Sequence, residues 1–455
     1  MSNSSIMNYL IIGNSASGRS AAREILGCDP TAKVTVISEE KSPAYYRPLI
    51  SHLLATDIAK EKIFMEPFNP EGEQEVNTRL GERATAIDAQ AKTVSLDNGE
   101  KLSYDRLLLS TGGRPIVPQI ERLETDGVYQ FNSLEDVGKI ISFSDKTERA
   151  VVVGGGLSGI RSACALRQIG KEVTVVELLD RPLWTVLDSN GAEIVRRHLE
   201  SQGVRIITER GVRRILSTNG RVSGVILSDG QGLDCQAVIL SIGVKPNLDL
   251  VDDSGLKVDR GILVNRSLQT SVSDIYAAGD VCETYDPTLG EFTVNANWTC
   301  AVQQGKLAGR NMRGGDEVYQ GSIATNSLDL LGLPCITLGV ANPNGGRFQI
   351  VSKTNPGRDV YRKLVFKGDL IVGAIFIGEI RGVGAISRLL QDRVPLGGIK
   401  DSILEEKRPY VHFLRSLYRD DLEDEIPWRQ ELWSTEKYKK KFDDERWKER
   451  ERSNQ

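Results

Sequence analysis

The amino-acid sequence predicts an α/β protein in which two related domains are followed by a smaller α+β domain and a charged helical tail. Three observations support this prediction. A unit made of an apolar run, a glycine turn and a small-residue helix occurs twice, at residues 9–22 and 151–163. The pattern changes after about residue 320, where alternating apolar runs begin. From residue 405 to the end, charged residues of both signs dominate, as in a solvated helix.

Composition excludes several classes of protein. The 455 residues include 58 Lys and Arg against 62 Asp and Glu, and this near-balance argues against a dedicated nucleic-acid binder. No uncharged apolar run approaches the ~20 residues that span a bilayer, and the N-terminus lacks the basic start of a secretory signal. The six cysteines, at positions 28, 164, 235, 282, 300 and 335, are too scattered for a disulfide framework. We therefore expect a cytoplasmic protein that is not inserted in a membrane.

Each copy of the repeat predicts a strand, a turn, a helix and a second strand, followed by an acidic residue. The first has the turn Gly13-x-Ser15-x-x-Gly18 and ends at Glu39, and the second has Gly154-x-Gly156-x-x-Gly159 and ends at Glu177. Hairpin-type turns follow at residues 97–99 and 228–230, and each copy closes on an apolar run, at 107–112 and 238–243. A unit of ~130 residues is too long for a solenoid repeat, so two related domains are predicted.

The second glycine turn fits a dinucleotide-binding fingerprint. Its first glycine permits a tight turn, its second lets a pyrophosphate approach the backbone, and its third lets the helix pack on the strand. The phosphates then lie at a helix N-terminus, where N–H groups favour negative charge. In the first copy Ser15 replaces the second glycine, and its small hydroxyl can still face a phosphate. A tight turn that binds nothing is the alternative, but the strand, helix and acid around both turns favour two dinucleotides.

The acids after the second strands indicate which dinucleotides bind. Glu39 and its neighbour Glu40 are rival acceptors for a ribose hydroxyl in the first copy. In the second copy Glu177 accepts from a free 2′-hydroxyl and repels a 2′-phosphate, which favours NAD over NADP, although Arg181 lies nearby. The economical pairing is one bound flavin and one exchangeable nicotinamide nucleotide.

Later segments predict further elements. Residues 259–280 suggest another strand pair. Residues 360–380 suggest a hairpin around residues 367–369, and residues 384–390 suggest a helix.

The chain resembles the two-dinucleotide flavoproteins of the pyridine nucleotide–disulfide oxidoreductase superfamily. Both fingerprints carry the resemblance, together with residues 110–115 (Ser-Thr-Gly-Gly-Arg-Pro), 242–247 and 275–281. Residues 45–51 narrow it to NADH:rubredoxin reductases, the flavin domain of assimilatory nitrite reductases and flavoproteins paired with carbon monoxide dehydrogenase ferredoxins. The resemblance implies two Rossmann-like domains of the glutathione-reductase type. It places an FAD-binding domain at 1–115 and 246–320, an NAD-binding domain at 116–245 and an α+β interface domain at 321–410. The charged helical tail at 411–455 lies beyond the family's C-terminal domain and is predicted from its charged residues.

The resemblance also implies roles for individual residues. Gly13, Ser15 and Gly18 take the FAD pyrophosphate, Arg47 and Pro48 lie along the flavin, and Asp280 holds a ribityl hydroxyl. A helix over residues 298–312 points its positive end at the flavin and stabilises negative charge there. The other cofactor positions are Ala16, Glu39, Glu40, Ala84, Thr111, Gly112, Gly154, Gly156, Leu157, Ser158, Gly159, Glu177, Gly243, Gly279, Trp298 and Thr299.

Two departures from the family pattern concern the reaction. Many relatives carry a Lys–Glu pair beside the flavin, and the aligned positions here are His52 and Arg161. They are the candidate catalytic residues. The alternative is that both lie at the solvent-exposed edge of the site and take no part in catalysis.

Disulfide reductases carry redox thiols early in the chain, whereas no cysteine lies between residues 29 and 163 here. We expect all six cysteines to be buried small apolar residues, and we expect no metal site.

The sequence thus predicts an FAD-dependent NADH oxidoreductase that exchanges electrons with a rubredoxin, a ferredoxin or an iron–sulfur subunit. An NADH oxidase that uses oxygen is one alternative, and a redox-responsive flavoprotein binding module is another. A homodimer or a subunit of a larger redox complex is expected, and the aromatic residues of the tail predict a surface for a protein partner.

Overall fold

A computed structural model describes residues 6–68, 76–251, 254–286, 288, 290–343, 348–397, 400, 403 and 404. The predicted tail at 411–455 and its partner surface lie outside the described residues. Within the described residues, no helix combines the length and the apolar character that crossing a membrane requires.

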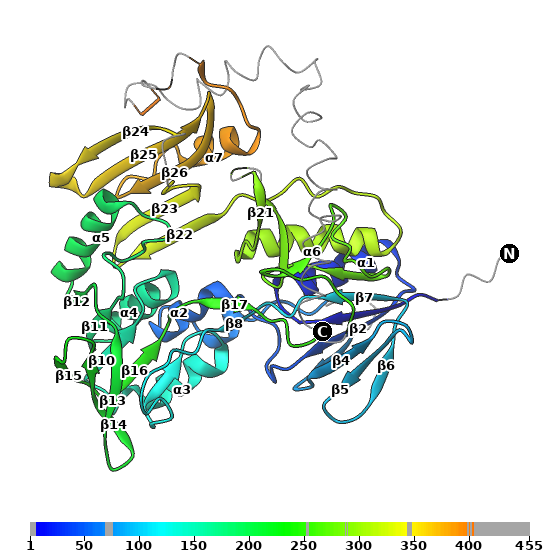
Figure 1. The fold of residues 1–455 in the computed structure, drawn as a ribbon, viewed down its shortest axis with the longest axis horizontal. Coiled ribbons are helices and arrows are strands. Elements are labelled where there is room, and N and C mark those ends of the chain that lie inside the picture. The colour runs from blue at the N-terminus through cyan, green and yellow to red at the C-terminus, as the bar shows by residue number, and fades with distance from the viewer. Residues whose placement is uncertain are drawn as a thin grey trace, which may run out of the picture. The chain divides into compact units, whose positions relative to one another are not determined.

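The first domain is built on a parallel sheet with the strand order β19-β7-β1-β2-β3 (Figure 1). Its strands are β1 (Asn8–Ile12), β2 (Lys33–Ser38), β3 (Asn77–Leu80), β7 (Arg106–Leu109) and β19 (Ile275–Ala277). Helix α1 (Ala16–Cys28) connects β1 to β2, and α6 (Trp298–Met312) packs against α1. An antiparallel sheet is formed by β4 (Ala84–Asp88), β5 (Thr93–Leu96) and β6 (Lys101–Ser103).

The second domain repeats this plan, with the parallel strand order β12-β11-β10-β16-β9. Its strands are β9 (Val128–Gln130), β10 (Arg149–Val153), β11 (Glu172–Val176), β12 (Val204–Ile207) and β16 (Ala237–Leu240). Its helices are α3 (Leu134–Ser144), α4 (Leu157–Gln168) and α5 (Ser189–Ser201), and its antiparallel strands are β13 (Val212–Thr218), β14 (Arg221–Leu227) and β15 (Gly232–Asp234). The predicted duplication and both hairpin turns are confirmed.

Short elements join these sheets. Strand β8 (Gly113–Pro115) pairs antiparallel with β17 (Val244–Pro246). The chain segment that leaves the first domain and the one that returns to it therefore run side by side. Between β2 and β3 lie η1 (Arg47–Leu49), α2 (Ile50–Leu54) and η2 (Lys60–Ile63). A further sheet contains β18 (Ile262–Leu263), β20 (Cys282–Asp286) and β21 (Glu291–Thr293). The strand pair expected within 259–280 is wrong, because β18 pairs with β20 while β19 joins β7.

The C-terminal domain is an antiparallel sheet with the order β22-β23-β26-β25-β24. Its strands are β22 (Thr325–Leu330), β23 (Leu333–Gly339), β24 (Gln349–Asn355), β25 (Val360–Lys367) and β26 (Leu370–Ile377), with η3 (Pro356–Arg358) and α7 (Val383–Gln391). The hairpin predicted around residues 367–369 and the helix predicted at 384–390 are both confirmed.

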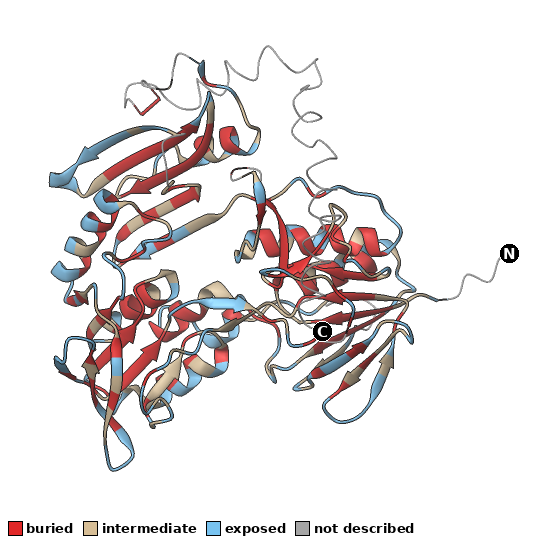
Figure 2. Cartoon of the chain, in the orientation of Figure 1, coloured by how far each residue is buried: buried red, intermediate tan, exposed pale blue. Residues whose placement is uncertain are grey.

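Burial follows the apolar runs of these sheets (Figure 2). Parallel strands are covered on both faces, so the central strands of the first two domains are apolar along their length. One apolar cluster joins the second domain to Tyr45, Leu53 and Ile63 from the segment after β2, and to Tyr361 and Ile377 of the C-terminal sheet. The segment that carries Arg47 and Pro48 is therefore anchored on the second domain.

Two glycines let helix α6 approach helix α1. A β-carbon on Gly305 would lie 2.2 Å from the carbonyl oxygen of Ser17, and one on Gly309 would lie 2.6 Å from that of Ala21. Both distances are far inside van der Waals contact, so these residues set the close crossing of the two helices. That crossing fixes where α6 begins, at Trp298.

This crossing can be tested with matched glycine substitutions. Gly305→Ala should lower the free energy of unfolding by about 1–3 kcal/mol, because the added methyl group forces the helices apart. Gly27→Ala, at an exposed position of α1 with no atom within 4 Å of the new β-carbon, should instead be neutral or stabilise by up to about 1 kcal/mol. Denaturant unfolding of both variants measures this, and equal effects would contradict the close crossing.

Candidate functional site

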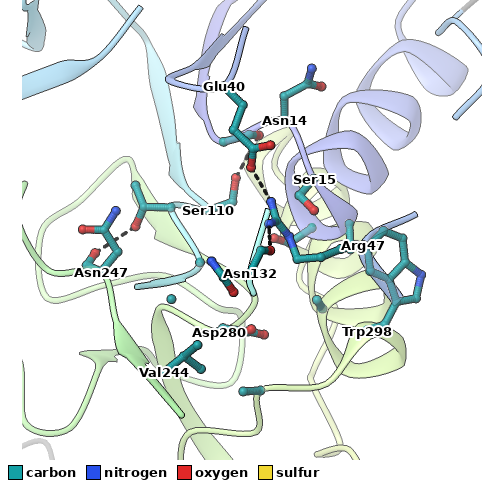
Figure 3. A pocket seen from close by; sticks show the side chains of 18 of the residues that line it. Asn14, Ser15, Glu40, Arg47, Ser110, Asn132, Val244, Asn247, Asp280 and Trp298 are labelled. Atoms are coloured by element: carbon teal, nitrogen blue, oxygen red, sulfur yellow. Dashed lines mark hydrogen bonds and ion pairs between the residues drawn. The ribbon is translucent and has the colours of Figure 1, made fainter. Parts of the chain in front are cut away.

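A cavity of about 530 Å³ lies at the carboxyl end of the first parallel sheet. Its wall combines the β1–α1 turn, the residues after β2, the turn η1 and the starts of α4 and α6 (Figure 3). The C-terminal domain adds the first residues of β22. The volume is in the range of small-molecule and cofactor sites.

Both fingerprint helices begin without a side-chain cap. Helix α1 follows Ser15 and α4 follows Gly156, and neither helix has a capping side chain or an acid in its first turn. By contrast α3, α5 and α6 are preceded by the N-cap residues Ser133, Asp188 and Asn297, whose side chains accept from helix N–H groups. The N–H groups that open α1 and α4 therefore remain available to an anion such as a pyrophosphate.

The glycines of the two turns occupy matching positions. Gly13 and Gly154 have φ values of +119° and +104°, which disfavour any residue with a side chain. A β-carbon on Gly18 or Gly159 would lie 1.9 Å from the carbonyl oxygen of Gly13 or Gly154, respectively. One on Gly156 would meet no atom within 4 Å, so the second position of the motif has room for a side chain, as Ser15 requires in the first copy.

Polar atoms in the wall lack protein partners. No group in the described residues hydrogen-bonds to the buried side-chain oxygen of Asn14, and Asp280 lines the cavity. Burial raises the pKa of Asp280 to about 6, and the positive charge of Arg47 opposes that rise. These groups, together with the uncapped start of α1, fit a ligand that carries phosphates and hydroxyls, as FAD does.

The two rival acids have different surroundings. Glu40 accepts from the Arg47 guanidinium at 2.5 Å and from the Tyr45 hydroxyl at 2.8 Å (Figure 3). Glu39 lines the same cavity, its side chain is 54% exposed, and the one ion pair it makes with the described residues is to Arg114, at 3.7 Å. The Glu40 carboxylate is thus committed to the protein, which leaves Glu39 as the better ribose acceptor.

Arg47 connects this wall to the second domain. Its guanidinium also donates to the carbonyl oxygen of Asn132, at 2.5 Å, just before α3. The contact brings a residue expected along the flavin to the boundary between the two domains. Sequence reasoning missed Asn132, because a backbone acceptor leaves no signal in residue type.

The structure brings most of the expected cofactor residues to one cavity. The lining residues among them are Gly13, Ser15, Ala16, Glu39, Glu40, Arg47, Pro48, Ala84, Thr111, Gly112, Leu157, Ser158, Arg161, Asp280, Trp298 and Thr299. The others do not line it and are Gly18, His52, Gly154, Gly156, Gly159, Glu177, Gly243 and Gly279. The lining also contains Asn326 and Ser327 of β22, which the sequence did not indicate.

Glu177 supports the second turn. One of its carboxylate oxygens accepts from the Gly155 N–H at 2.6 Å and the other accepts from the Leu179 N–H at 2.9 Å. Arg181, the nearby cation that favoured NADP, is bound by both carboxylate oxygens of Asp180, at 2.7 and 2.8 Å. Both carboxylate oxygens of Glu177 are thus engaged by backbone N–H groups, so in this structure the residue supports the turn, and a ribose hydroxyl would have to share one of these oxygens.

His52 and Arg161 do not form a pair. The His52 ring lies 3.4 Å from Asp57, both side chains are well exposed, and neither lines the cavity. Arg161 does line it, and its guanidinium donates to the carbonyl oxygen of Pro48. Burial lowers the pKa of Arg161, yet an arginine stays charged. Among the described residues no carboxylate binds Arg161, so one positive charge faces the cavity.

The cysteines differ from the expectation at one position. Cys28 is exposed, whereas Cys164, Cys235, Cys282, Cys300 and Cys335 are buried. Cys28 ends α1, beyond the buried stripe that stops at Leu26, so the prediction that all six are buried is wrong. In the described part of the chain, no group of three or more His, Cys, Asp or Glu side chains is placed to hold a metal ion.

Comparison with protein families gives two matches. The family described as pyridine nucleotide-disulphide oxidoreductase matches residues 7–305. The family described as the rubredoxin NAD+ reductase C-terminal domain matches residues 325–394.

Individual relatives agree with these matches. The chain is 34% identical to an NADH oxidase of Methanocaldococcus jannaschii, over 68% of this chain and 70% of that protein. It is 30% identical to the NADH-rubredoxin oxidoreductase of Clostridium acetobutylicum, over 82% of this chain and 91% of that protein. It is 28% identical to the nitrite reductase [NAD(P)H] of Bacillus subtilis, over 81% of this chain, and spans only 45% of that relative. Among solved structures, the NAD-dependent persulfide reductase from A. fulgidus has a TM-score of 0.80 and 29% identity, over 86% of this chain and 77% of that chain.

The contrast between Glu39 and Glu40 yields a prediction. Glu39→Gln should weaken FAD binding by about 10-fold, or about 1.4 kcal/mol, with little change in the stability of the FAD-free protein. Glu40→Gln should lower that stability instead, because it leaves Arg47 without its carboxylate. FAD titration and thermal unfolding of both variants measure the two effects. The opposite pattern would identify Glu40 as the ribose acceptor.

The raised pKa of Asp280 predicts how FAD affinity depends on pH. A hydroxyl that donates to the ionised carboxylate lowers its pKa on binding, so binding is tightest above pH 6, where the free site is already ionised. Below that pH the dissociation constant of FAD should rise by up to about 10-fold per pH unit. Asp280→Asn should remove this dependence. A variant that keeps the same pH profile would show that Asp280 does not contact FAD.

Proposed function

Because this chain belongs to the pyridine nucleotide-disulphide oxidoreductase family, we propose that it transfers electrons between NAD(H) and an external one-electron carrier without a redox-active disulfide. Its cofactors are FAD and NAD(H). In this proposal residues 1–115 and 246–320 form the FAD-binding domain, 116–245 the NAD-binding domain and 321–410 the C-terminal interface domain. The protein acts as a homodimer or as a subunit of a larger complex. Its six free thiols agree with a reducing compartment such as the cytoplasm.

The observation that carries the proposal is the absence of a thiol at the cavity. Its lining residues within the described chain include no cysteine, and Arg47 and Pro48 occupy the segment after β2. Cys164 lies three residues beyond Arg161 but is buried, and burial raises its pKa to about 12, so it stays protonated. A protonated, enclosed thiol is a poor redox group. Electrons on the flavin therefore pass directly to an external acceptor.

An aromatic pair marks the side where a carrier docks. The rings of Tyr46 and Trp298 have centroids 5.9 Å apart. Trp298 lines the cavity and Tyr46 is 39% exposed, so the pair extends from the cavity to the surface. Aromatic residues of this kind are enriched at the centres of protein interfaces. A carrier docked here is a rubredoxin, a ferredoxin or an iron–sulfur subunit, in keeping with the rubredoxin NAD+ reductase C-terminal domain match.

FAD bound in this cavity would supply the chemistry of accepting a hydride from NADH and releasing electrons one at a time. The protein contributes binding and electrostatics. Gly13, Ser15 and Ala16 receive the FAD pyrophosphate, Glu39 its ribose and Asp280 its ribityl chain. Residues 154–159 and Glu177 hold NAD(H). The N-terminus of α6, at Trp298 and Thr299, presents positive dipole charge to the cavity and stabilises an anion there.

Arg161 adds a second positive charge at the cavity, where α4 meets Pro48. It is the better candidate of the two expected catalytic residues, because His52 lies outside the lining. Its role is to orient rings and favour negative charge, since hydride transfer needs no protein acid.

An NADH oxidase is the second candidate function. The relative from Methanocaldococcus jannaschii carries that name, and a flavin without a neighbouring thiol can also give its electrons to oxygen. Hydrogen peroxide would then be the expected product.

Steady-state assays with NADH distinguish the two functions. With rubredoxin or ferredoxin under anaerobic conditions, turnover should exceed oxygen consumption in air by at least about 10-fold. Tyr46→Ala should lower kcat/KM for the protein carrier by about 10-fold, or 1.4 kcal/mol, while reduction of ferricyanide by NADH is unchanged. Ile141→Ala, a similarly exposed apolar residue on α3 outside the cavity, is the matched control. Oxygen consumption faster than reduction of every carrier would favour the oxidase.

A further inference from the structure

The segment between β11 and α5 folds back on the second fingerprint turn. The N–H of Leu183 donates to the carbonyl oxygen of Gly155 at 2.8 Å, and the N–H of Leu187 donates to Leu183 at 2.8 Å. Leu183 is fully buried and has a φ of +54°, a conformation that is strained for a leucine. Gly155 is thus held from both sides, because Glu177 accepts its N–H and Leu183 binds its carbonyl.

The same segment ends at Asp188, which the C-terminal domain binds. One carboxylate oxygen accepts from the Tyr361 hydroxyl at 2.7 Å and from the Lys363 ammonium at 2.8 Å. The other accepts from the Gly191 N–H at 3.0 Å and caps α5. The Lys363 side chain is only 3% exposed, so it depends on this carboxylate as its counter-ion. Figure 1 shows α5 next to the C-terminal sheet.

Two more contacts connect the C-terminal domain to this region. The Asn342 amide donates to the carbonyl oxygen of Trp184 at 3.3 Å, within the segment itself. A β-carbon on Gly191 would lie 3.2 Å from the Ile377 side chain, so the start of α5 packs closely on β26. The C-terminal domain therefore contacts the last part of the segment, at Trp184 and at Asp188.

We infer that Asp188 is a positioning residue for NAD(H): by fixing residues 178–188 to the C-terminal sheet, it keeps Leu183 on Gly155 and so holds the turn that receives the coenzyme pyrophosphate. Asp188 acts through Leu183 and Gly155. The inference rests on the proposed function in one respect, which is that NAD(H) binds at the second fingerprint.

Two variants of the contact test the inference, with NADH as the donor and ferricyanide as the acceptor. Tyr361→Phe removes one hydrogen bond and should raise KM for NADH about 3-fold, and Asp188→Asn should raise it about 10-fold, with kcat within about 2-fold of wild type. FAD content should stay at the wild-type level in both. A rise in KM without a fall in kcat separates positioning from general damage. Tyr361→Phe decides the question if Asp188→Asn does not fold.

Arg197→Ala is the matched control. Arg197 lies on α5 and binds Asp359 of the C-terminal domain at 2.8 Å, but among the described residues no hydrogen bond or ion pair joins it to residues 178–188. The KM of the Arg197→Ala variant for NADH should equal that of wild type. An unchanged KM in folded, FAD-containing Tyr361→Phe and Asp188→Asn would overturn the inference, as would an equal rise in Arg197→Ala. A wild-type protein that NADH does not reduce would instead overturn the proposed function.

Discussion

The absence of side chains at Gly18 and Gly159 is the constraint from which the geometry of both fingerprint turns follows. At each position the helix lies so close to the preceding turn that a β-carbon would overlap a carbonyl oxygen. Because of that approach, the uncapped N–H groups of α1 and α4 face outward at the carboxyl end of a parallel sheet. Residues that follow the neighbouring strands, such as Glu39 and Asp280, come to the same edge of the first sheet.

The C-terminal sheet takes part in both sites. Its strand β22 supplies Asn326 and Ser327 to the cavity, and Asn297, which caps α6, donates to the carbonyl oxygen of Thr325. Its strand β25 binds Asp188 beside the second fingerprint. One sheet thus contacts helix α6, which lines the cavity with Trp298 and Thr299, and the segment that supports the second fingerprint turn.

Local patterns predicted much of this structure. The two strand–turn–helix–strand units and the hairpin around residues 367–369 each follow from periodicity and turn residues within a short stretch, whereas the helix at 298–312 is implied by the family resemblance. The position of His52 outside the cavity could not be predicted in this way. The orientation of α2, which carries His52, depends on how Leu53 and Ile63 pack on the core of the second domain. Asn132 and strand β22 are also far in sequence from the other residues of the cavity. Asn132 contributes a backbone atom, and β22 contributes ordinary polar residues.

The central claim is that the flavin alone stores the electrons taken from NADH. An anaerobic reductive titration with dithionite, followed by the flavin absorbance and by a count of electrons taken up per bound FAD, tests it most directly. A thiol pair next to the flavin adds two electrons to the two that FAD holds. This account predicts full reduction after two electrons per FAD, and uptake of four would contradict it.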